Sequence, residues 1–435
     1  MSIMSLRGLG GILVTTLILS GCSLFDDDER LEGERIKLRD QQRAGQTFTG
    51  TAPALPQARR NAEWTQTNGL SSHASGHLEG PTSLTVAWRA DVGSGGGDGI
   101  TSTPIIAGGR VFALDAESQL SAFDAGSGSV AWRTDLAPEG EDGGDGFGGG
   151  LSTEGGTVFA TTGFGEVLAV NASSGEIIWR YKAAAPFRAA PAVDRGTVIA
   201  VTRDNRGVAI SAQSGQLIWR IDGISGSAGL LGGASPAISG RLAVLPFASG
   251  EVIGADTLSG RTRWSAVLGG ARRGLARASI SDVTGDPVIV GRAVVAANQS
   301  GRIVAIDGQT GRRGWTRSIG STGPLWAAGQ SIYMVSDDAA VMRLSVQTGQ
   351  TVWRTEIPAF EDEEDREDPI AYSGPVLVAG RLLVTSSLGE LLSYDAQTGE
   401  ALGAVDIADG TTTGVAVANG TVYVLSEGGT LQAFR

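Results

Sequence analysis

A tryptophan recurs about every 45 residues along most of this chain, each time a few positions after a turn rich in Gly and other small residues. The series runs through Trp132, Trp179, Trp219, Trp264, Trp315 and Trp353, and four of these six are followed directly by Arg. A period of this length predicts an array of similar structural units stacked on one another.

The composition of one unit indicates its structure. Residues 157–162, 167–171 and 176–180 are short runs rich in β-branched and aromatic residues, and turns that contain Gly separate them. No stretch of helical period is long enough to intervene. We therefore predict that each unit is a small antiparallel meander, which is one blade of a β-propeller.

The turn before each tryptophan strand allows the units to be counted. Asp, Asn or Ser opens the turn, where it can bond the local backbone, and Gly closes it, where a tight hairpin needs positive φ. Seven complete units have this turn, at residues 124–128, 171–175, 211–215, 256–260, 307–311, 345–349 and 395–399.

An eighth unit is split between the two ends of the chain. Residues 420–434 match the first part of a unit and stop before its tryptophan strand, whereas residues 85–91, which contain Trp88, parallel residues 129–135. Pairing the two segments would close the ring and leave no long exposed sheet edge. The predicted fold is therefore all-β: an eight-bladed β-propeller of four-stranded antiparallel blades over residues 63–435.

The recurring tryptophan is interpreted as packing between blades rather than as a ligand-binding residue. Leu402 is taken as its counterpart in the seventh complete unit. A leucine can pack between blades but has no group that could take part in a reaction. One large domain agrees with the length of 435 residues, because repeats enlarge a propeller without requiring one giant core. The net charge of −12 and the absence of a basic run argue against nucleic-acid binding by phosphate neutralisation.

The N-terminus has the pattern of an export signal. Arg7 precedes a largely apolar run at residues 9–19, too short to remain as a membrane-spanning helix, and Leu-Ser-Gly-Cys ends at Cys22. This site resembles a bacterial lipoprotein processing site, which implies a signal peptide at residues 1–21 and a lipidated Cys22. By the same resemblance, Ser23 after Cys22 favours the outer membrane. A chance cysteine beside an ordinary signal peptide is the alternative, and Met1 and Met4 are both candidate starts.

Residues 22–62 are predicted to be a polar tether between the lipid anchor and the propeller. Residues 26–29 are acidic, and residues 47–57 are rich in Thr, Ala and Pro. Residues 30–42 could form a short charged helix, and a helix at residues 31–38 could meet a partner, but a flexible spacer is the favoured interpretation.

The sequence contains few of the side chains that usually bind metals or act as catalysts. The only histidines are His73 and His77, which lie in a segment of loop-like composition, and Cys22 is the only cysteine. No metal site, cofactor or catalytic group is therefore predicted. Two acidic segments, residues 139–145 and 361–368, lack the ligand spacing of an EF-hand and are predicted to be solvated loops rather than Ca²⁺ sites.

The repeat resembles that of the pyrroloquinoline-quinone-type propellers over residues 81–435. The shared pattern is Gly-x-Val-Phe or Tyr, then Gly-x-Leu-x-Ala-x-Asp, then Thr or Ser before Gly, then Trp-Arg. Together with Cys22, it resembles the propeller lipoproteins of the outer-membrane β-barrel assembly machine. That resemblance implies a non-enzymatic scaffold on the periplasmic face of the outer membrane. It would bind the periplasmic repeat domains of the central barrel subunit and assist nascent outer-membrane proteins.

Two partner-binding loops are implied by the same resemblance. In the Asp-Val-Asp-x-x-Pro segment of the family, Asp282 matches, Thr284 replaces the second Asp, and Asp286 is a candidate replacement carboxylate. In the Leu-x-Leu-Arg-Gly segment, Leu230 matches and Leu231 stands at the Arg position. Positive charge nearby comes from Arg272, Arg273 and Arg277. A turn-capping role is the alternative for Asp282.

Two other functions stay open. A quinoprotein dehydrogenase would, by the resemblance, carry an adjacent cysteine pair and Ca²⁺ ligands, and this chain has no second cysteine. A lipoprotein scaffold for another envelope complex or for cell-wall material is the other alternative.

Overall fold

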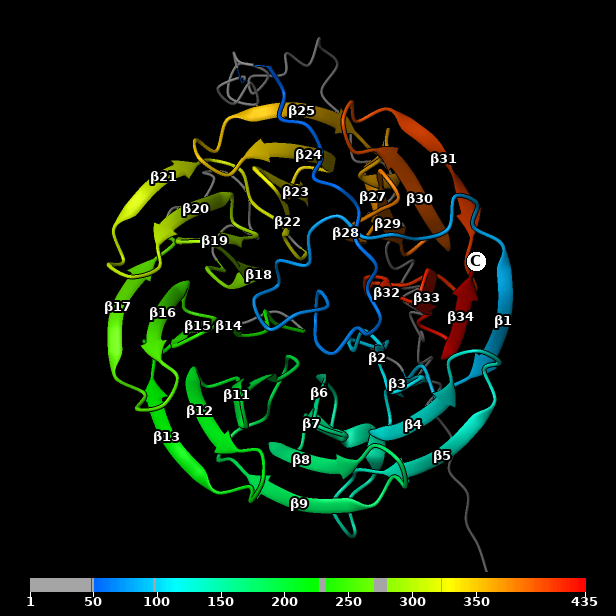
Figure 1. Ribbon diagram of the computed structural model, residues 1–435, viewed down its shortest axis with the longest axis vertical. Coiled ribbons are helices and arrows are strands. Elements are labelled where there is room, and N and C mark those ends of the chain that lie inside the picture. The colour runs from blue at the N-terminus through cyan, green and yellow to red at the C-terminus, as the bar shows by residue number, and fades with distance from the viewer. Residues whose placement is uncertain (1–47, 49–50, 97–98, 227–231, 270–279, 322) are drawn as a thin grey trace, which may run out of the picture. The chain divides into compact units, whose positions relative to one another are not determined.

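The computed structural model describes residues 48, 51–96, 99–226, 232–269, 280–321 and 323–435. The chain divides into units of residues 1–44 and 45–435, and every described residue belongs to the second unit. Within it, eight four-stranded antiparallel sheets surround a common axis (Figure 1). The predicted eight-bladed all-β propeller is confirmed.

The first four blades follow one another along the chain. Blade 1 is β2 (Ile105–Ala107), β3 (Arg110–Leu114), β4 (Gln119–Asp124) and β5 (Val130–Asp135). Blade 2 is β6 (Gly149–Glu154), β7 (Thr157–Thr162), β8 (Glu166–Asn171) and β9 (Ile177–Lys182). Blade 3 is β10 (Ala192–Asp194), β11 (Thr197–Val201), β12 (Arg206–Ser211) and β13 (Leu217–Asp222). Blade 4 is β14 (Ala237–Ser239), β15 (Leu242–Pro246), β16 (Glu251–Asp256) and β17 (Thr262–Val267).

The other four blades complete the ring. Blade 5 is β18 (Val283–Val290), β19 (Ala293–Asn298), β20 (Arg302–Asp307) and β21 (Arg313–Arg317). Blade 6 is β22 (Trp326–Ala328), β23 (Ser331–Val335), β24 (Ala340–Ser345) and β25 (Thr351–Glu356). Blade 7 is β28 (Tyr372–Val378), β29 (Arg381–Ser386), β30 (Glu390–Asp395) and β31 (Ala401–Asp406). Blade 8 joins β1 (Val86–Asp91) to β32 (Ala416–Ala418), β33 (Thr421–Leu425) and β34 (Thr430–Phe434).

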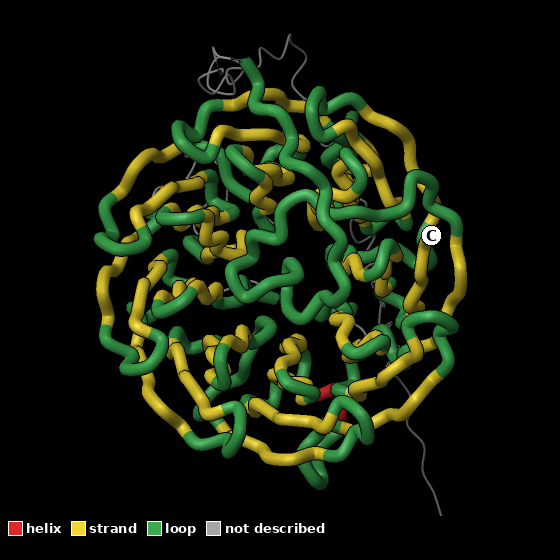
Figure 2. Tube along the Cα trace, in the orientation of Figure 1, coloured by secondary structure: helices red, strands yellow, loops and turns green. Residues whose placement is uncertain are grey.

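Both predicted acidic loops carry some regular structure. Residues 361–368 lie in a two-stranded hairpin of β26 (Phe360–Asp362) and β27 (Glu367–Pro369), and residues 139–145 include the 3-10 turn η1 (Gly143–Asp145). Figure 2 shows how little helix accompanies the strands. Among the described residues, no helix is both long and apolar enough to span a membrane.

Each recurring tryptophan joins its blade to the next blade. Trp132 on β5 donates its indole N–H to the Ala172 carbonyl in the β8–β9 turn of blade 2, at 3.1 Å. The same bond recurs for the other members of the series. The pairs are Trp88 with Ala125, Trp179 with Ala212, Trp219 with Thr257, Trp264 with Gly308, Trp315 with Val346 and Trp353 with Ala396. We call this arrangement the tryptophan clamp, and it confirms the predicted packing between blades.

The glycine that closes each turn is part of the clamp. Gly175 has φ +79°, and a Cβ placed there would lie 2.7 Å from the Trp132 ring. The glycine is therefore required both for a left-handed backbone and for the approach of the indole. The corresponding glycine lies against the corresponding tryptophan in the other six clamps, at Gly128, Gly215, Gly260, Gly311, Gly349 and Gly399.

The prediction that Leu402 occupies the tryptophan position was wrong. Ala122 of β4 pairs with Trp132, and the equivalent Ser393 of β30 pairs with Gly403, because each outer strand has a register shift after its first residue. Leu402 is 55% exposed. Sequence spacing missed the register by one residue, which is enough to turn a strand side chain to the other face.

Blade 8 is shared by β1, the first strand of the propeller, and by the last three strands. β1 pairs with β34 in antiparallel register, so that Trp88 lies opposite Ala433. Arg435 and Thr85 also exchange both backbone hydrogen bonds, at 2.9 and 3.0 Å. That this shared sheet closes the ring in solution stays a prediction, as do the domain boundaries at residues 22 and 63.

Residues 59–79 cross the axis of the ring as a loop, and we call them the axial segment (Figure 1). The innermost strand of each blade is a sheet edge with backbone groups that need partners. The axial segment bonds the inner part of all eight blades. In order from blade 1 to blade 8, the partners are Trp64 with Ile106, Thr65 with Thr153, Gln66 with Val193, Ser71 with Ile238, Ser72 with Ile289, Gly76 with Trp326, Leu78 with Leu377 and Asn61 with Asn419.

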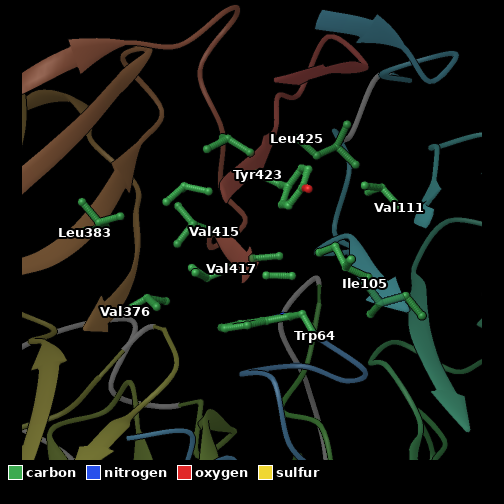
Figure 3. Close-up of a cluster of buried hydrophobic side chains, with 14 of the residues drawn as sticks. Trp64, Ile105, Val111, Val376, Leu383, Val415, Val417, Tyr423 and Leu425 are labelled. Carbon is green, nitrogen blue, oxygen red and sulfur yellow. The ribbon is translucent and has the colours of Figure 1, made fainter. Parts of the chain in front are cut away.

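Aromatic packing adds to these bonds near the axis. Trp64 is 1% exposed and stacks on Trp326, with ring centroids 5.9 Å apart. Figure 3 shows Trp64 beside side chains of blades 1, 7 and 8, among them Ile105, Val376 and Val417. The core of these blades therefore extends into the axial segment, and blade contacts begin before residue 63.

Candidate partner-binding site

The candidate site lies where blades 3, 4 and 5 approach the axis. Asp282 precedes β18, and its side chain is fully buried. Arg188, in the connection between β9 and β10, donates to both oxygens of the Asp282 carboxylate, Nη1 at 2.5 Å and Nη2 at 2.7 Å. Such a two-pronged pair fixes both side chains in orientation as well as distance.

Arg188 also connects the two loops that the family resemblance implied. Its Nη1 donates to the carbonyl of Gly232 at 3.2 Å, and Gly232 immediately follows the predicted Leu230 and Leu231. Leu230 and Leu231 themselves, like Arg272, Arg273 and Arg277, lie outside the described residues. The structure therefore brings the described ends of both predicted loops together around one guanidinium.

Asp286 is buried and bonds the backbone just after the loop that contains Leu230 and Leu231 in sequence. β18 has register shifts around residues 283–288. The Asp286 carboxylate there accepts from the Ser235 amide at 2.7 Å and from the Asn68 side chain at 3.2 Å. Burial raises the pKa of the Asp286 carboxyl, against the opposing effects of His73 and of these two donors. Thr284, at the position of the second family carboxylate, donates its hydroxyl to the Ser321 carbonyl at 2.7 Å.

Sequence analysis named Asp282, Thr284 and Asp286 but missed Arg188. Both oxygens of the Asp282 carboxylate accept from Arg188, and the turn-capping alternative for Asp282 stays untested. Arg188 comes from a repeat earlier than both implied loops, so no local spacing in those loops points to it. The only hint of Arg188 in the sequence was its position in a connection between two blades. Each such connection leads to the innermost strand of the next blade, close to the axis.

Exposed apolar side chains flank the two loops. Ile224 follows β13 and leads toward Gly232, and it is 55% exposed. Val267 ends β17, ahead of Asp282 along the chain, and it is 46% exposed. The buried carboxylates of Asp282 and Asp286 therefore position the loops, whereas Ile224 and Val267 expose apolar atoms to solvent beside them.

The two histidines have separate partners and do not face one another as metal ligands. His73 is buried, and its Nδ1 lies 2.8 Å from the Pro287 carbonyl, so Nδ1 carries the hydrogen. Burial lowers the pKa of His73, and Asp286 opposes that effect. His77 donates from Nδ1 to the Pro56 carbonyl and accepts the Gly380 amide at Nε2, both at 2.8 Å. In the described part of the chain, no group of three His, Cys, Asp or Glu side chains is arranged to hold a metal ion.

The repeat, the clamps and the ring define the class as an eight-bladed β-propeller of the pyrroloquinoline-quinone-type repeat. A family model described as "Outer membrane protein assembly factor BamB" matches residues 81–144 and 116–355, which is more than half of the chain. The chain belongs to this family.

Curated relatives carry the same description. The Shigella dysenteriae protein is 27% identical over 206 residues, which is 47% of this chain and 50% of that protein. The chain thus spans about half the length of the first curated relatives that it matches. The Yersinia pestis protein is 24% identical over 428 residues, which is 97% of each chain.

Solved structures share the fold. BamB from Moraxella catarrhalis is 20% identical, with a TM-score of 0.68, over 81% of this chain and 100% of that one. Quinohemoprotein alcohol dehydrogenase from Comamonas testosteroni is 14% identical, with a TM-score of 0.66, over 87% of this chain and 81% of that one. At these identities the likeness concerns the fold alone, and it includes both assembly factors and dehydrogenases.

Proposed function

We propose that this protein is a non-enzymatic scaffold of the outer-membrane β-barrel assembly complex. It is anchored by lipidated Cys22 at the periplasmic face of the outer membrane. It binds the periplasmic repeat domains of the central barrel subunit and assists the insertion of nascent outer-membrane β-barrel proteins. Family membership and the N-terminal pattern support this proposal.

The observation that carries the binding part is the Arg188 junction. Arg188 bonds Asp282 and Gly232, so one side chain fixes both segments that the family resemblance implied. We place the partner surface on the face formed by Gly232, Gly233, Ser281, Ile224 and Val267. Asp282 and Asp286 act from below as positioning residues, because both are buried. Leu230, Leu231 and Thr284 belong to the same proposed surface.

We expect the proposed contact with the partner to be more apolar than the presence of Asp282 and Asp286 alone would suggest. Ile224 and Val267 are exposed, whereas the charges of Arg188 and Asp282 are directed at each other. Interface energy usually comes from a few central residues, and charged groups at the rim contribute more to association rate. We therefore expect only a modest dependence of binding on salt.

Affinity purification tests the assignment. The tagged chain would be recovered from detergent-solubilised membranes, and the co-purifying proteins would be identified. Recovery of the central barrel subunit supports the proposal. Recovery of a different envelope complex without that subunit contradicts it and favours the other scaffold function.

A quinoprotein dehydrogenase is the second candidate, and the fold shared with quinohemoprotein alcohol dehydrogenase favours it. The residues present do not fit the group that this resemblance implies, because Cys22 is the only cysteine and cannot form an adjacent pair. We expect no alcohol or sugar oxidation when purified protein is supplied with pyrroloquinoline quinone, Ca²⁺ and a dye acceptor. Turnover that depends on the quinone would contradict the scaffold assignment.

A further inference from the structure

Among the residues that the structure describes, the joint between blades 7 and 8 lacks the tryptophan clamp that each of the other seven joints possesses. Gly403 replaces the tryptophan on β31. In the described part of blade 8, no turn is placed to receive an indole, because the paired outer strands β34 and β1 are not joined to each other by a hairpin turn. Both halves of the clamp are therefore absent at one place in the ring.

The axial segment bonds strongly to both sides of this joint. On blade 7, the backbone of Leu78 donates to Leu377 at 3.1 Å and accepts from Ala379 at 2.8 Å. His77 adds its Nε2, which accepts the Gly380 amide at 2.8 Å. Leu78 is fully buried, so the segment is packed against blade 7 as well as bonded to it.

Asn61 makes the matching contacts on blade 8. Its carbonyl accepts the Asn419 amide, and its side-chain amide donates to the Val417 carbonyl, both at 2.7 Å. The Asn419 side chain returns a bond to the Ala62 carbonyl at 3.0 Å. These bonds occupy the edge and the first turn of β32.

The two ends of the axial segment are tied to each other across the joint. Arg59 donates its backbone N–H to the His77 carbonyl at 3.0 Å and accepts from Glu79 at 2.8 Å. The Arg59 guanidinium also donates to the Ser75 carbonyl. Hydrogen bonds and short stretches of backbone therefore connect blade 8 through Asn61 and Arg59 to Leu78 and blade 7.

We propose that the axial segment is a lock that holds the clampless joint between blades 7 and 8 closed. It takes the place of an eighth tryptophan clamp, for which β31 carries Gly403 in place of the tryptophan and β34 and β1 have no shared turn. Local opening of a protein starts where the fewest interactions must break. With the lock weakened, the ring opens first at this joint.

Hydrogen–deuterium exchange of the full mature chain tests the lock. The double variant Asn61→Ala with His77→Ala removes one side-chain bond to each blade and keeps the backbone bonds. We expect amides of β28, β29, β32 and β33 to exchange at least tenfold faster, which is about 1.4 kcal/mol of local stability. Amides of β10 and β11 keep their rates.

Glu154→Ala is the matched control. Glu154 also bonds across a joint, accepting from Arg195 and Gly196 at 2.8 Å each, but Trp179 clamps that joint. We expect little change in exchange anywhere in this variant. An equal rise in all blades of the double variant, no rise at all, or the same local rise in the control would overturn the proposal.

A cleavable chain provides a second measurement that does not depend on substitutions in the lock. A protease site is inserted between the exposed residues Thr82 and Ser83, and the folded protein is cut there. We expect the N-terminal fragment to stay bound during gel filtration, and its slow loss to accelerate exchange first in blades 7 and 8. Loss of the fragment with unchanged exchange at this joint would show that the segment is not a lock.

Discussion

At the residue scale, Arg188 supplies the positive charge that is missing from the two predicted partner-binding loops. The position of the family arginine is Leu231 in this chain, yet Asp282 still has a guanidinium partner, contributed by the connection between blades 2 and 3. A buried ion pair is costly to break because one charge is left without its partner. The pair therefore links the two loops through side chains that are both buried.

A double-mutant cycle measures that pair. We expect Arg188→Ala and Asp282→Ala each to lower the free energy of unfolding by about 3 to 5 kcal/mol. The double variant should lose clearly less than the sum, because residues in one ion pair are coupled. Urea unfolding of the four proteins gives the coupling, and strict additivity would show that the pair contributes nothing as a unit.

His73 makes stability depend on pH. Its pKa is lowered in the folded protein, so the unfolded chain takes up the proton first as pH falls below about 6.5. Stability is thus complete above that pH and decreases on acidification, by up to about 1.4 kcal/mol per pH unit for one group. Asp286 acts in the opposite direction, because its raised pKa favours the folded state at low pH.

Replacing the imidazole isolates its contribution. His73→Gln keeps a donor for the Pro287 carbonyl and removes the titrating group. Unfolding free energies at pH 7, 6 and 5 should decline less steeply for the variant than for the unaltered protein. Identical slopes would mean that His73 does not remain neutral in the folded protein.

At the element scale, the clamp explains why each unit ends with Gly before its tryptophan strand. Gly175 and Gly156 have nearly the same φ, +79° and +80°, but only Gly175 faces an indole. Both alanine variants bear the same backbone strain, and Gly175→Ala additionally forces Trp132 to move. We expect Gly175→Ala to be less stable than Gly156→Ala by about 1 to 3 kcal/mol in chemical unfolding. Equal losses would show that backbone strain alone selects glycine in this turn.

The blades could be predicted from the sequence because their pattern repeats. The last four residues of Val130–Asp135 alternate between half-buried and exposed positions, and the turns follow rules that depend on neighbouring residues alone. The axial segment has no repeat, since Asn61, Gln66 and Leu78 each meet a different blade. Its contacts depend on the assembled ring, and so do Arg188 and the inward orientation of Asp286.

At the scale of the whole molecule, we assign separate roles to the proposed lipid anchor and to the ring. Cys22 lies outside the described residues, and its lipidation rests on the Leu-Ser-Gly-Cys pattern. We expect Cys22→Ala to abolish membrane retention, because acyl chains contribute about 0.8 kcal/mol per buried CH₂ and the variant would carry none. Membrane fractionation in cells that lack the proposed partners makes the measurement. Continued sedimentation with outer membrane would contradict lipid anchoring.

The most direct measurement of the central claim is the dissociation constant of the purified mature chain with the periplasmic repeat domains of the central barrel subunit. We expect Ile224→Asp with Val267→Asp to weaken binding at least about tenfold, or 1.4 kcal/mol, while the fold is retained. The matched control, Val130→Asp with Leu402→Asp, changes side chains of similar exposure on blades 1 and 7 and should bind as the unaltered chain does. Absence of binding by the unaltered chain, or equal affinity of the two double variants, would contradict the account.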